Sequence, residues 1–217
     1  MKPKTLTKTS VFPFWLCNYN LLSGFLWGLL LIQTSYLQFK PLGGQPRLFQ
    51  ATYSNLLVIE TLALVELYNA AAGIVKSSVF TTFIQLYARF SIIWGLLYPF
   101  SDSDFNNSTS CYYYMVVAWS VTEVIRYNYY AANMIFQGEP GKVLTWLRYN
   151  TFLVMYPLGL FCEVSILLGN FPDFVAALGG SRAAELFFYT LLLLYIPGFS
   201  LLYGHMLKQR KKIMRKF

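Results

Sequence analysis

The sequence predicts an all-α membrane protein, a bundle of about six transmembrane helices with both termini in the cytosol. Apolar residues make up 56% of the 217 residues, and 12% are charged, where soluble domains carry about a quarter. Apolar runs of membrane-spanning length also follow one another along the chain. The expected spans are residues 14–36, 50–75, 79–100, 112–135, 146–169 and 185–207, with a basic tail at 208–217. We expect one integral membrane domain over 1–217.

The first span is expected to be an uncleaved helix. Lysines precede it, and its apolar run continues to Tyr36 without the small-residue cleavage site of a signal peptide. The segment from Lys40 to Pro46 is rich in proline and glycine and ends this helix.

The middle spans contain ionisable residues. Glu60 and Glu66 in the second span either face an arginine inside the bundle, which we favour for Glu66, or lie near a membrane face. The third span contains Arg89. In the fourth, Glu123 and Arg126 are three residues apart, the spacing of an ion pair on one helix face.

The last two spans each contain a proline. Pro157 in the fifth removes a backbone N–H, so the helix is expected to bend or loosen there. In the sixth, Pro197 and Gly198 are expected to break the helix.

Positive charge gathers on one side of the predicted membrane, which fixes the orientation because cytosolic segments are rich in Lys and Arg. The cations on that side are Lys2, Lys4, Lys8, Lys76, Lys142, Arg148, Lys208, Arg210, Lys211, Lys212, Arg215 and Lys216. Only Lys40, Arg47 and Arg182 fall in the expected lumenal loops, where Asn106 and Asn107 begin overlapping glycosylation sequons. This pattern accounts for the net charge of +8 without a nucleic-acid partner.

The cysteines and the histidine do not predict a metal site. Cys17, Cys111 and Cys162 have no CxxC spacing, and His205, the single histidine, precedes the basic tail. Neither a zinc site nor a disulfide framework follows from these positions. Cys162 has no activating base nearby in sequence, so it is not expected to be a nucleophile.

The fifth span holds the candidate catalytic pair, Tyr156 and Glu163. Ionisable side chains at membrane depth are costly, and they therefore indicate a functional site. Seven residues are two helical turns, so both side chains lie on one face, about 10 Å apart along the axis of an unbroken helix. The residues alone leave open that Tyr156 is an interfacial or core tyrosine, and that Glu163 forms a structural ion pair or lies near the membrane edge.

Three ordered sequence blocks resemble those of one enzyme family. Tyr-Pro-Leu-Gly from Tyr156, with Glu163 following and Trp-Leu-Arg-Tyr from Trp146 preceding, forms the first block. The segment from Trp119 to Tyr127 resembles the pattern W-S-x-T-E-x-I-R-Y, and the segment from Gly73 to Ser77 resembles G-x-V-[RK]-S. The chain is thereby similar to the 3-hydroxyacyl-CoA dehydratases, membrane enzymes of very-long-chain fatty acid elongation once labelled protein tyrosine phosphatase-like.

This resemblance implies dehydration of (3R)-3-hydroxyacyl-CoA to trans-2-enoyl-CoA, a carbon–oxygen lyase reaction and the third step of the elongation cycle. It implies a multi-pass protein of the endoplasmic reticulum membrane that needs no cofactor or metal. The elongase, the ketoreductase and the enoyl reductase of the elongation complex would be its partners.

The reaction needs a positioned base and a positioned acid. We expect Glu163 to remove the C2 proton and Tyr156 to donate to the departing oxygen, with the reverse assignment open. Lys76, Lys142 and Arg148 are expected to contact the phosphates of coenzyme A. Arg126 either contacts phosphate, orients the catalytic carboxylate, or forms an internal salt bridge.

Supporting roles are expected for Glu66, Asn69, Glu123 and Tyr149. The resemblance has one departure here, because the family pattern Leu-Glu-x-x-His is met by Glu66 but has Asn69 in the histidine position. Asparagine forms hydrogen bonds but does not titrate at neutral pH.

Two other functions compete with the enzyme. The first is a catalytically weak or inactive family member that acts as a membrane scaffold for elongation enzymes, as Asn69 suggests. The second is a small transporter with Glu66, Glu123 and Glu163 as a proton relay, but the predicted spans show no repeat symmetry.

Overall fold

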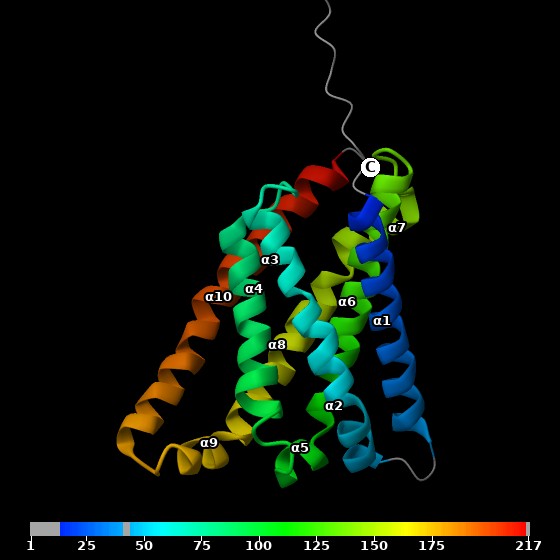
Figure 1. The fold of residues 1–217 in the computed structure, drawn as a ribbon. Coiled ribbons are helices and arrows are strands. Elements are labelled where there is room, and N and C mark those ends of the chain that lie inside the picture. Colours follow the sequence, from blue (N-terminus) through cyan, green and yellow to red (C-terminus); the bar gives the residue numbers. More distant parts are fainter. Residues whose placement is uncertain (1–13, 41–43, 216–217) are drawn as a thin grey trace, which may run out of the picture.

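The structure, a computed structural model, describes residues 14–40 and 44–215. These residues form ten α-helices and one π-helical turn, and no β-strand occurs among them (Figure 1). The elements are α1 (Phe14–Phe39), α2 (Gly44–Leu62), α3 (Leu64–Ala71), α4 (Val79–Ile92), the π-helical turn η1 (Ile93–Leu97), α5 (Asp104–Ser108), α6 (Ser110–Ile135), α7 (Lys142–Asn150), α8 (Phe152–Gly169), α9 (Phe171–Ala177) and α10 (Arg182–Met214).

Five helical segments of the described chain are long and apolar enough to cross a membrane: Phe14–Phe39, Arg47–Ala71, Val79–Leu97, Lys142–Gly169 and Arg182–Met214. The all-α membrane class is therefore confirmed. The expected span 112–135 is helical as part of α6, but α6 is not one of the five. Serine, threonine, asparagine and the charged pair Glu123 and Arg126 lower its hydropathy.

Two expected spans are each divided between two helices. The span 50–75 contains a junction at Ala63, where α2 ends and α3 begins, and the helical part stops at Ala71. The span 146–169 contains a junction at Thr151 between α7 and α8. Both junction residues keep helical backbone angles at the start of the second helix, so each apolar segment continues through a local change of helix.

The prediction that Pro197 and Gly198 break the last helix is wrong. Helix α10 continues without interruption from Arg182 to Met214, with Pro197 inside it. Proline lacks one hydrogen-bond donor, and membrane helices tolerate this loss through local adjustment. Most of the residues predicted as a basic tail therefore extend the helix. Pro157 likewise lies inside a continuous α8.

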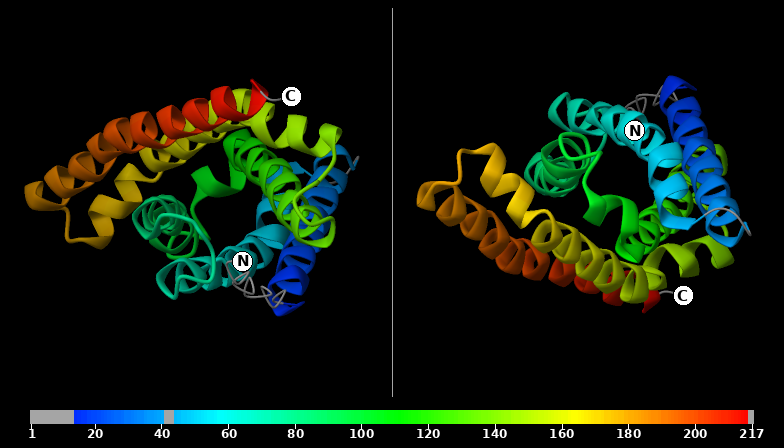
Figure 2. Two further views of the ribbon diagram at one scale, coloured as in Figure 1. Left: turned by 90° about the horizontal axis from the view of Figure 1, so that it is seen from above. Right: turned by 90° about the horizontal axis from the view of Figure 1, so that it is seen from below.

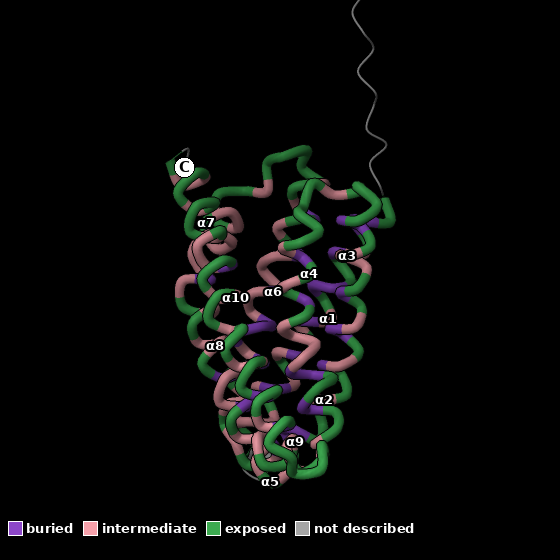
Figure 3. The backbone as a smooth tube through the Cα atoms, turned by 90° about the vertical axis from the view of Figure 1, so that its left-hand side faces the viewer, coloured by how far each residue is buried: buried purple, intermediate pink, exposed green. Residues whose placement is uncertain are grey.

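Helix α6 is the centre of the bundle and contacts α1, α2, α7 and α8. Its side chains Tyr112, Met115 and Trp119 join Trp27 of α1 and Ile166 of α8 in one buried cluster. Buried positions recur along the lengths of the packed helices (Figure 3). Because lipid is as apolar as these side chains, close packing holds such helices together in a membrane. Packing around α6 thus positions α8, on which the candidate pair lies.

Helix α10 lies on the outside of the bundle, beside α8 (Figure 2). It contacts α4, α7, α8 and α9. Only 11% of the residues in its most apolar stretch are nevertheless buried by the rest of the protein. The direction of the chain in α10 is opposite to that in α8 (Figure 1).

At the end of the molecule where α5 and α9 lie, two buried asparagines join α5 to the end of α8. Asn106 and Asn170 are both fully buried, and each donates its amide Nδ2 to the other's Oδ1, at 2.9 and 2.8 Å. The amide of Asn106 is therefore inaccessible in the folded protein, and the first of the two sequons cannot accept a glycan in this state.

Candidate active site

The carboxylate of Glu163 faces the centre of the bundle. Its Oε1 accepts a hydrogen bond of 2.8 Å from Nε1 of Trp119, which links α8 to α6. Gly159, one turn earlier on α8, packs against the same indole, and a Cβ at this position would lie 3.6 Å from the ring. The indole of Trp119 therefore fixes the carboxylate from the neighbouring helix.

Arg89 lies on the other side of the Trp119 ring. The guanidinium carbon is 4.8 Å from the ring centroid, a cation–π arrangement that keeps a positive charge beside the indole. Arg89 also forms ion pairs with Glu123, at 2.8 Å, and with the fully buried Glu60, at 3.3 Å. Its charge reaches Glu163, so α4 contributes electrostatically to the surroundings of this carboxylate.

A second arginine extends this network toward α3. Arg126 donates from Nη1 and Nη2 to the two oxygens of Glu66, at 2.7 and 2.6 Å, and from Nε to Oε2 of Glu123, at 2.6 Å. Tyr127 adds a hydrogen bond from its hydroxyl to Glu66. The expected arginine partner of Glu66 and the expected pair of Glu123 with Arg126 are thereby confirmed.

Tyr156 packs against α10. Its ring stacks on Phe199 and on Tyr203, with centroid distances of 5.4 and 5.8 Å. Within the described part of the chain, its hydroxyl forms no hydrogen bond. The hydroxyl is near enough to Glu163 for a charge interaction through space. The stacked ring is therefore held in place while its hydroxyl is available to a ligand.

The residues expected to contact phosphate fall into two groups. Lys76 is exposed in the connection from α3 to α4, and Lys142 is exposed at the start of α7. Arg148 of α7 donates to the hydroxyl of Tyr130 at 3.4 Å. The elements that carry these three residues lie at the end of the molecule where α10 ends (Figure 1). Arg126 is instead engaged with two carboxylates, which favours the internal salt bridge for this residue.

The remaining expected residues are placed as follows. The ring of Tyr149 meets that of Tyr129 edge to face, at 5.9 Å. Asn69 of α3 is buried, and its Oδ1 accepts no hydrogen bond from the described residues. Among those residues, no group of three or more His, Cys, Asp or Glu could hold a metal ion.

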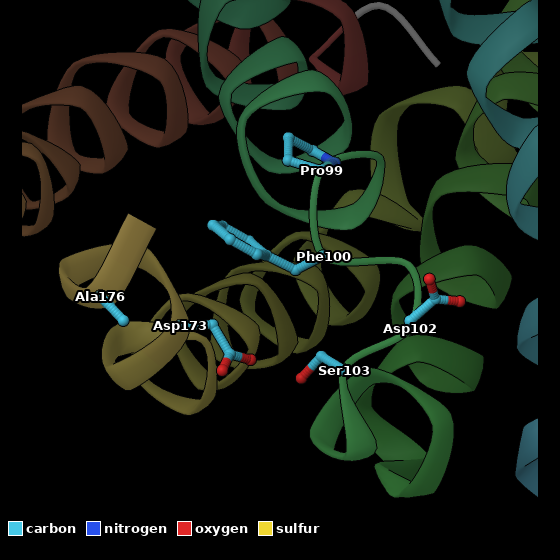
Figure 4. A pocket seen from close by; sticks show the side chains of 6 residues that line it. All are labelled: Pro99, Phe100, Asp102, Ser103, Asp173 and Ala176. Carbon is cyan, nitrogen blue, oxygen red and sulfur yellow. The ribbon is translucent and has the colours of Figure 1, made fainter. Parts of the chain in front are cut away.

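A hollow of about 350 Å³ opens at the opposite end of the molecule, between the turn after η1 and α9 (Figure 4). Two acidic residues, Asp102 and Asp173, are among the residues that line it. This hollow is unsuited to the phosphates of coenzyme A because like charges repel.

Sequence reasoning offered an arginine partner for Glu60 without naming it, and it assigned no role to Arg89 or Trp119. A signal was present, since an arginine inside an apolar run requires a carboxylate partner and Glu60 lies in the preceding span. Trp119 belongs to the block that carries the resemblance, but its hydrogen bond to Glu163 depends on the packing of α6 against α8.

The fold and the site define a multi-helix membrane protein with paired charges and a phenol inside its bundle. The profile of the family described as "Protein tyrosine phosphatase-like protein, PTPLA" matches residues 60–216. The chain therefore belongs to this family, as its sequence blocks predict.

Relatives with assigned names agree with this assignment. The "Probable very-long-chain (3R)-3-hydroxyacyl-CoA dehydratase" of Schizosaccharomyces pombe is 37% identical over 198 residues, 91% of each chain. The dehydratase hpo-8 of Caenorhabditis elegans is 32% identical over 92% of this chain and 94% of its own length. The human very-long-chain (3R)-3-hydroxyacyl-CoA dehydratase 2 is 30% identical over 79% of this chain and 70% of its own. No solved structure matches the chain.

Proposed function

We propose that this protein dehydrates (3R)-3-hydroxyacyl-CoA to trans-2-enoyl-CoA in very-long-chain fatty acid elongation, as its relatives' names indicate for them. The observation that carries the proposal is the arrangement on α8. Glu163 is fixed by Trp119, and Tyr156 is stacked with a hydroxyl that forms no hydrogen bond to a described residue. One carboxylate and one phenol are a sufficient minimal set of base and acid for this elimination.

In the proposed reaction, Glu163 is the base and Tyr156 the acid. The carboxylate removes the proton from C2, whose acidity comes from the adjacent thioester, and the phenol donates a proton to the hydroxyl that leaves C3. The hydrogen bond from Trp119 holds the carboxylate without neutralising it. Arg89, over the face of the same indole, brings a positive charge close to this carboxylate.

The proposed topology counts α6 as a sixth crossing, because this helix is central and its charged residues Glu123 and Arg126 are paired inside the bundle. Residues 1–217 then form one domain in the endoplasmic reticulum membrane, with both termini in the cytosol. The basic end of α10, the start of α7 and the connection from α3 to α4 face the cytosol. There, Lys76, Lys142 and Arg148 contact the phosphates of coenzyme A, while the acyl chain stays in hydrocarbon.

The elongase, the ketoreductase and the enoyl reductase of the elongation complex are the proposed partners, because they make the substrate and consume the product. An inactive scaffold would bind the same enzymes without catalysing the reaction. Turnover by the isolated protein separates the two functions.

The test uses protein purified in detergent with 3-hydroxystearoyl-CoA, and the enoyl product is measured by mass spectrometry. We expect turnover in the wild type and its loss in Tyr156→Phe and in Glu163→Gln. Glu139→Gln, at an exposed residue of the connection from α6 to α7, is the control and is expected to keep full activity. If the wild type is inactive, the proposed dehydratase activity is refuted and the scaffold function remains.

A further inference from the structure

A second phenol, Tyr195 of α10, reaches the interior beside the candidate pair. Its hydroxyl oxygen is buried and forms no hydrogen bond with any described residue. Its ring packs against the hydrophobic core. A buried hydroxyl without a partner costs free energy, so its presence calls for an explanation.

The register of α8 against α10 places Tyr195 between the levels of Tyr156 and Glu163. Tyr156 stacks on Phe199 and Tyr203, and the two helices run in opposite directions (Figure 1). Tyr195 is four residues before Phe199 on the same face of α10, which is about 6 Å along the axis toward the end where Glu163 lies. Glu163 is about 10 Å from Tyr156 along α8.

Charge interactions agree with this placement. Glu163 and Tyr156 both interact with Tyr195 through space, and Tyr87 of α4 does so as well. The hydroxyl therefore lies within range of charged or phenolic groups on α8 and α4, the helices that also hold the candidate base, the candidate acid and Arg89.

The proposed reaction leaves one charge without a partner. When Glu163 takes the C2 proton, the electron pair of the C–H bond moves toward the thioester, and negative charge develops on the carbonyl oxygen. Enzymes stabilise such an oxyanion with hydrogen-bond donors placed in advance. Glu163 removes the proton from C2, and Tyr156 donates its proton to the hydroxyl on C3. Neither side chain therefore provides the donor for the carbonyl oxygen.

Building on the proposed function, we propose that Tyr195 is a further catalytic residue, whose hydroxyl donates a hydrogen bond to the thioester carbonyl oxygen. The electron pair then returns from the oxygen to form the C2=C3 double bond, and the C3–O bond breaks. The departing oxygen takes the Tyr156 proton and leaves as water. Glu163 passes its proton, through solvent, to the Tyr156 phenolate, so the enzyme regains its starting state without a co-reactant.

The first test compares Tyr195→Phe with the wild type and with Tyr189→Phe. Tyr189 lies on the same helix and its side chain is 48% exposed, so its hydroxyl serves as a matched control. We expect kcat for 3-hydroxystearoyl-CoA to fall about 100-fold or more in Tyr195→Phe, the effect of losing one oxyanion donor, with KM little changed. Tyr189→Phe keeps the wild-type rate. In detergent, Tyr195→Phe is expected to unfold at the wild-type temperature or above it, because the change removes a buried hydroxyl that bonds no described residue.

The second test isolates proton removal. Stearoyl-CoA has no 3-hydroxyl and cannot eliminate, so exchange of its C2 hydrogen for deuterium in D2O reports the step at C2 alone. We expect exchange in the wild type and in Tyr156→Phe, and a loss of about 100-fold in Tyr195→Phe.

The outcomes separate the two proposals. If the wild type converts 3-hydroxystearoyl-CoA but Tyr195→Phe keeps the wild-type kcat and exchange rate, the role of Tyr195 is refuted and the proposed function stands. If the wild type neither converts the substrate nor exchanges the C2 hydrogen, the proposed function is refuted, and this role with it.

Discussion

The edge and a face of the Trp119 indole both make contacts that bear on the site. Its Nε1 donates to Glu163, and its face is covered by the guanidinium of Arg89. A hydrogen bond to a charged group contributes about 1.5–3 kcal/mol, so this one is strong enough to fix the orientation of the carboxylate. The single indole therefore places the candidate base and a positive charge next to each other.

The variant Trp119→Phe separates the contribution of the indole hydrogen bond from that of the aromatic ring. This change keeps an aromatic face for Arg89 but removes the N–H, so Glu163 loses its fixed orientation. We expect kcat to fall by about tenfold to a hundredfold in the detergent assay, because misplaced catalytic groups lose rate steeply. The control is Trp94→Phe. Trp94 is partly exposed and its indole N–H donates to Thr61, so this variant also loses an indole hydrogen bond but is expected to keep the wild-type activity. Equal rates in the two variants would contradict the role of Trp119.

Arg89 forms ion pairs with the buried carboxylates of Glu60 and Glu123. Breaking a buried pair by removing one partner typically costs about 3–5 kcal/mol, because a charge is left uncompensated. We expect Arg89→Leu to lower the unfolding temperature in detergent, and Glu60→Gln to restore part of that loss when added to it. Arg182→Leu, at an exposed residue that begins α10, is the control. If Glu60→Gln restored nothing, Glu60 would not depend on Arg89 for its charge balance.

At the level of single residues, the sequence predicted contacts within one helix better than contacts between helices. Glu123 with Arg126 follows from a three-residue spacing that any helix brings together. Arg89 with Glu60 and Trp119 with Glu163 depend on which faces of α2, α4, α6 and α8 meet. A spacing along the chain does not contain that information.

At the scale of the elements, the contact of α8 with α5 is the closest approach at any glycine of the described chain. A Cβ on Gly169 would lie 2.1 Å from the ring of Phe105, so the ring would have to move. This contact lies beside the Asn106–Asn170 pair and joins the same two helices.

Gly169→Ala is therefore expected to lower the unfolding temperature, by an amount that corresponds to about 1–3 kcal/mol of overpacking. Gly198→Ala is the matched control inside α10, where a Cβ would meet no atom within 4 Å. Thermal unfolding in one detergent compares the two. A drop for Gly198→Ala as large as that for Gly169→Ala would show that the contact with Phe105 is not the cause.

Helix boundaries show which element features were predictable. The apolar runs locate most of the long helices because membrane length and hydropathy are properties of the chain itself. The continuation of α10 through Pro197 was not predictable, since surroundings decide whether the lost hydrogen bond ends a helix. For the same reason, the junctions at Ala63 and Thr151 appear only in the folded chain.

For the whole molecule, the distribution of charge distinguishes its two ends. Lys76 and Lys142 lie on elements at one end, whereas Asp102 and Asp173 line the hollow at the other (Figures 1 and 4). In the proposed orientation, the first end meets the cytosol and the second the lumen.

Cysteine labelling in sealed microsomes tests this orientation. Ser77→Cys lies in the connection from α3 to α4, Ala177→Cys lies at the end of α9, and both positions are exposed. A membrane-impermeant maleimide is expected to label Ser77→Cys in intact vesicles, and Ala177→Cys only after detergent is added. The native Cys17 and Cys162 are buried and Cys111 is partly buried, so labelling of the unsubstituted protein measures the background. The opposite labelling pattern would invert the topology.

The most direct measurement of the central claim is a double-variant cycle on α8. The rates of 3-hydroxystearoyl-CoA dehydration are compared in the wild type, Tyr156→Phe, Glu163→Gln and the variant with both changes. Because residues that act as a unit show strongly non-additive effects, we expect each single change to remove nearly all turnover and the second to add little. A wild-type rate in Glu163→Gln, with protein that is folded, would contradict the account.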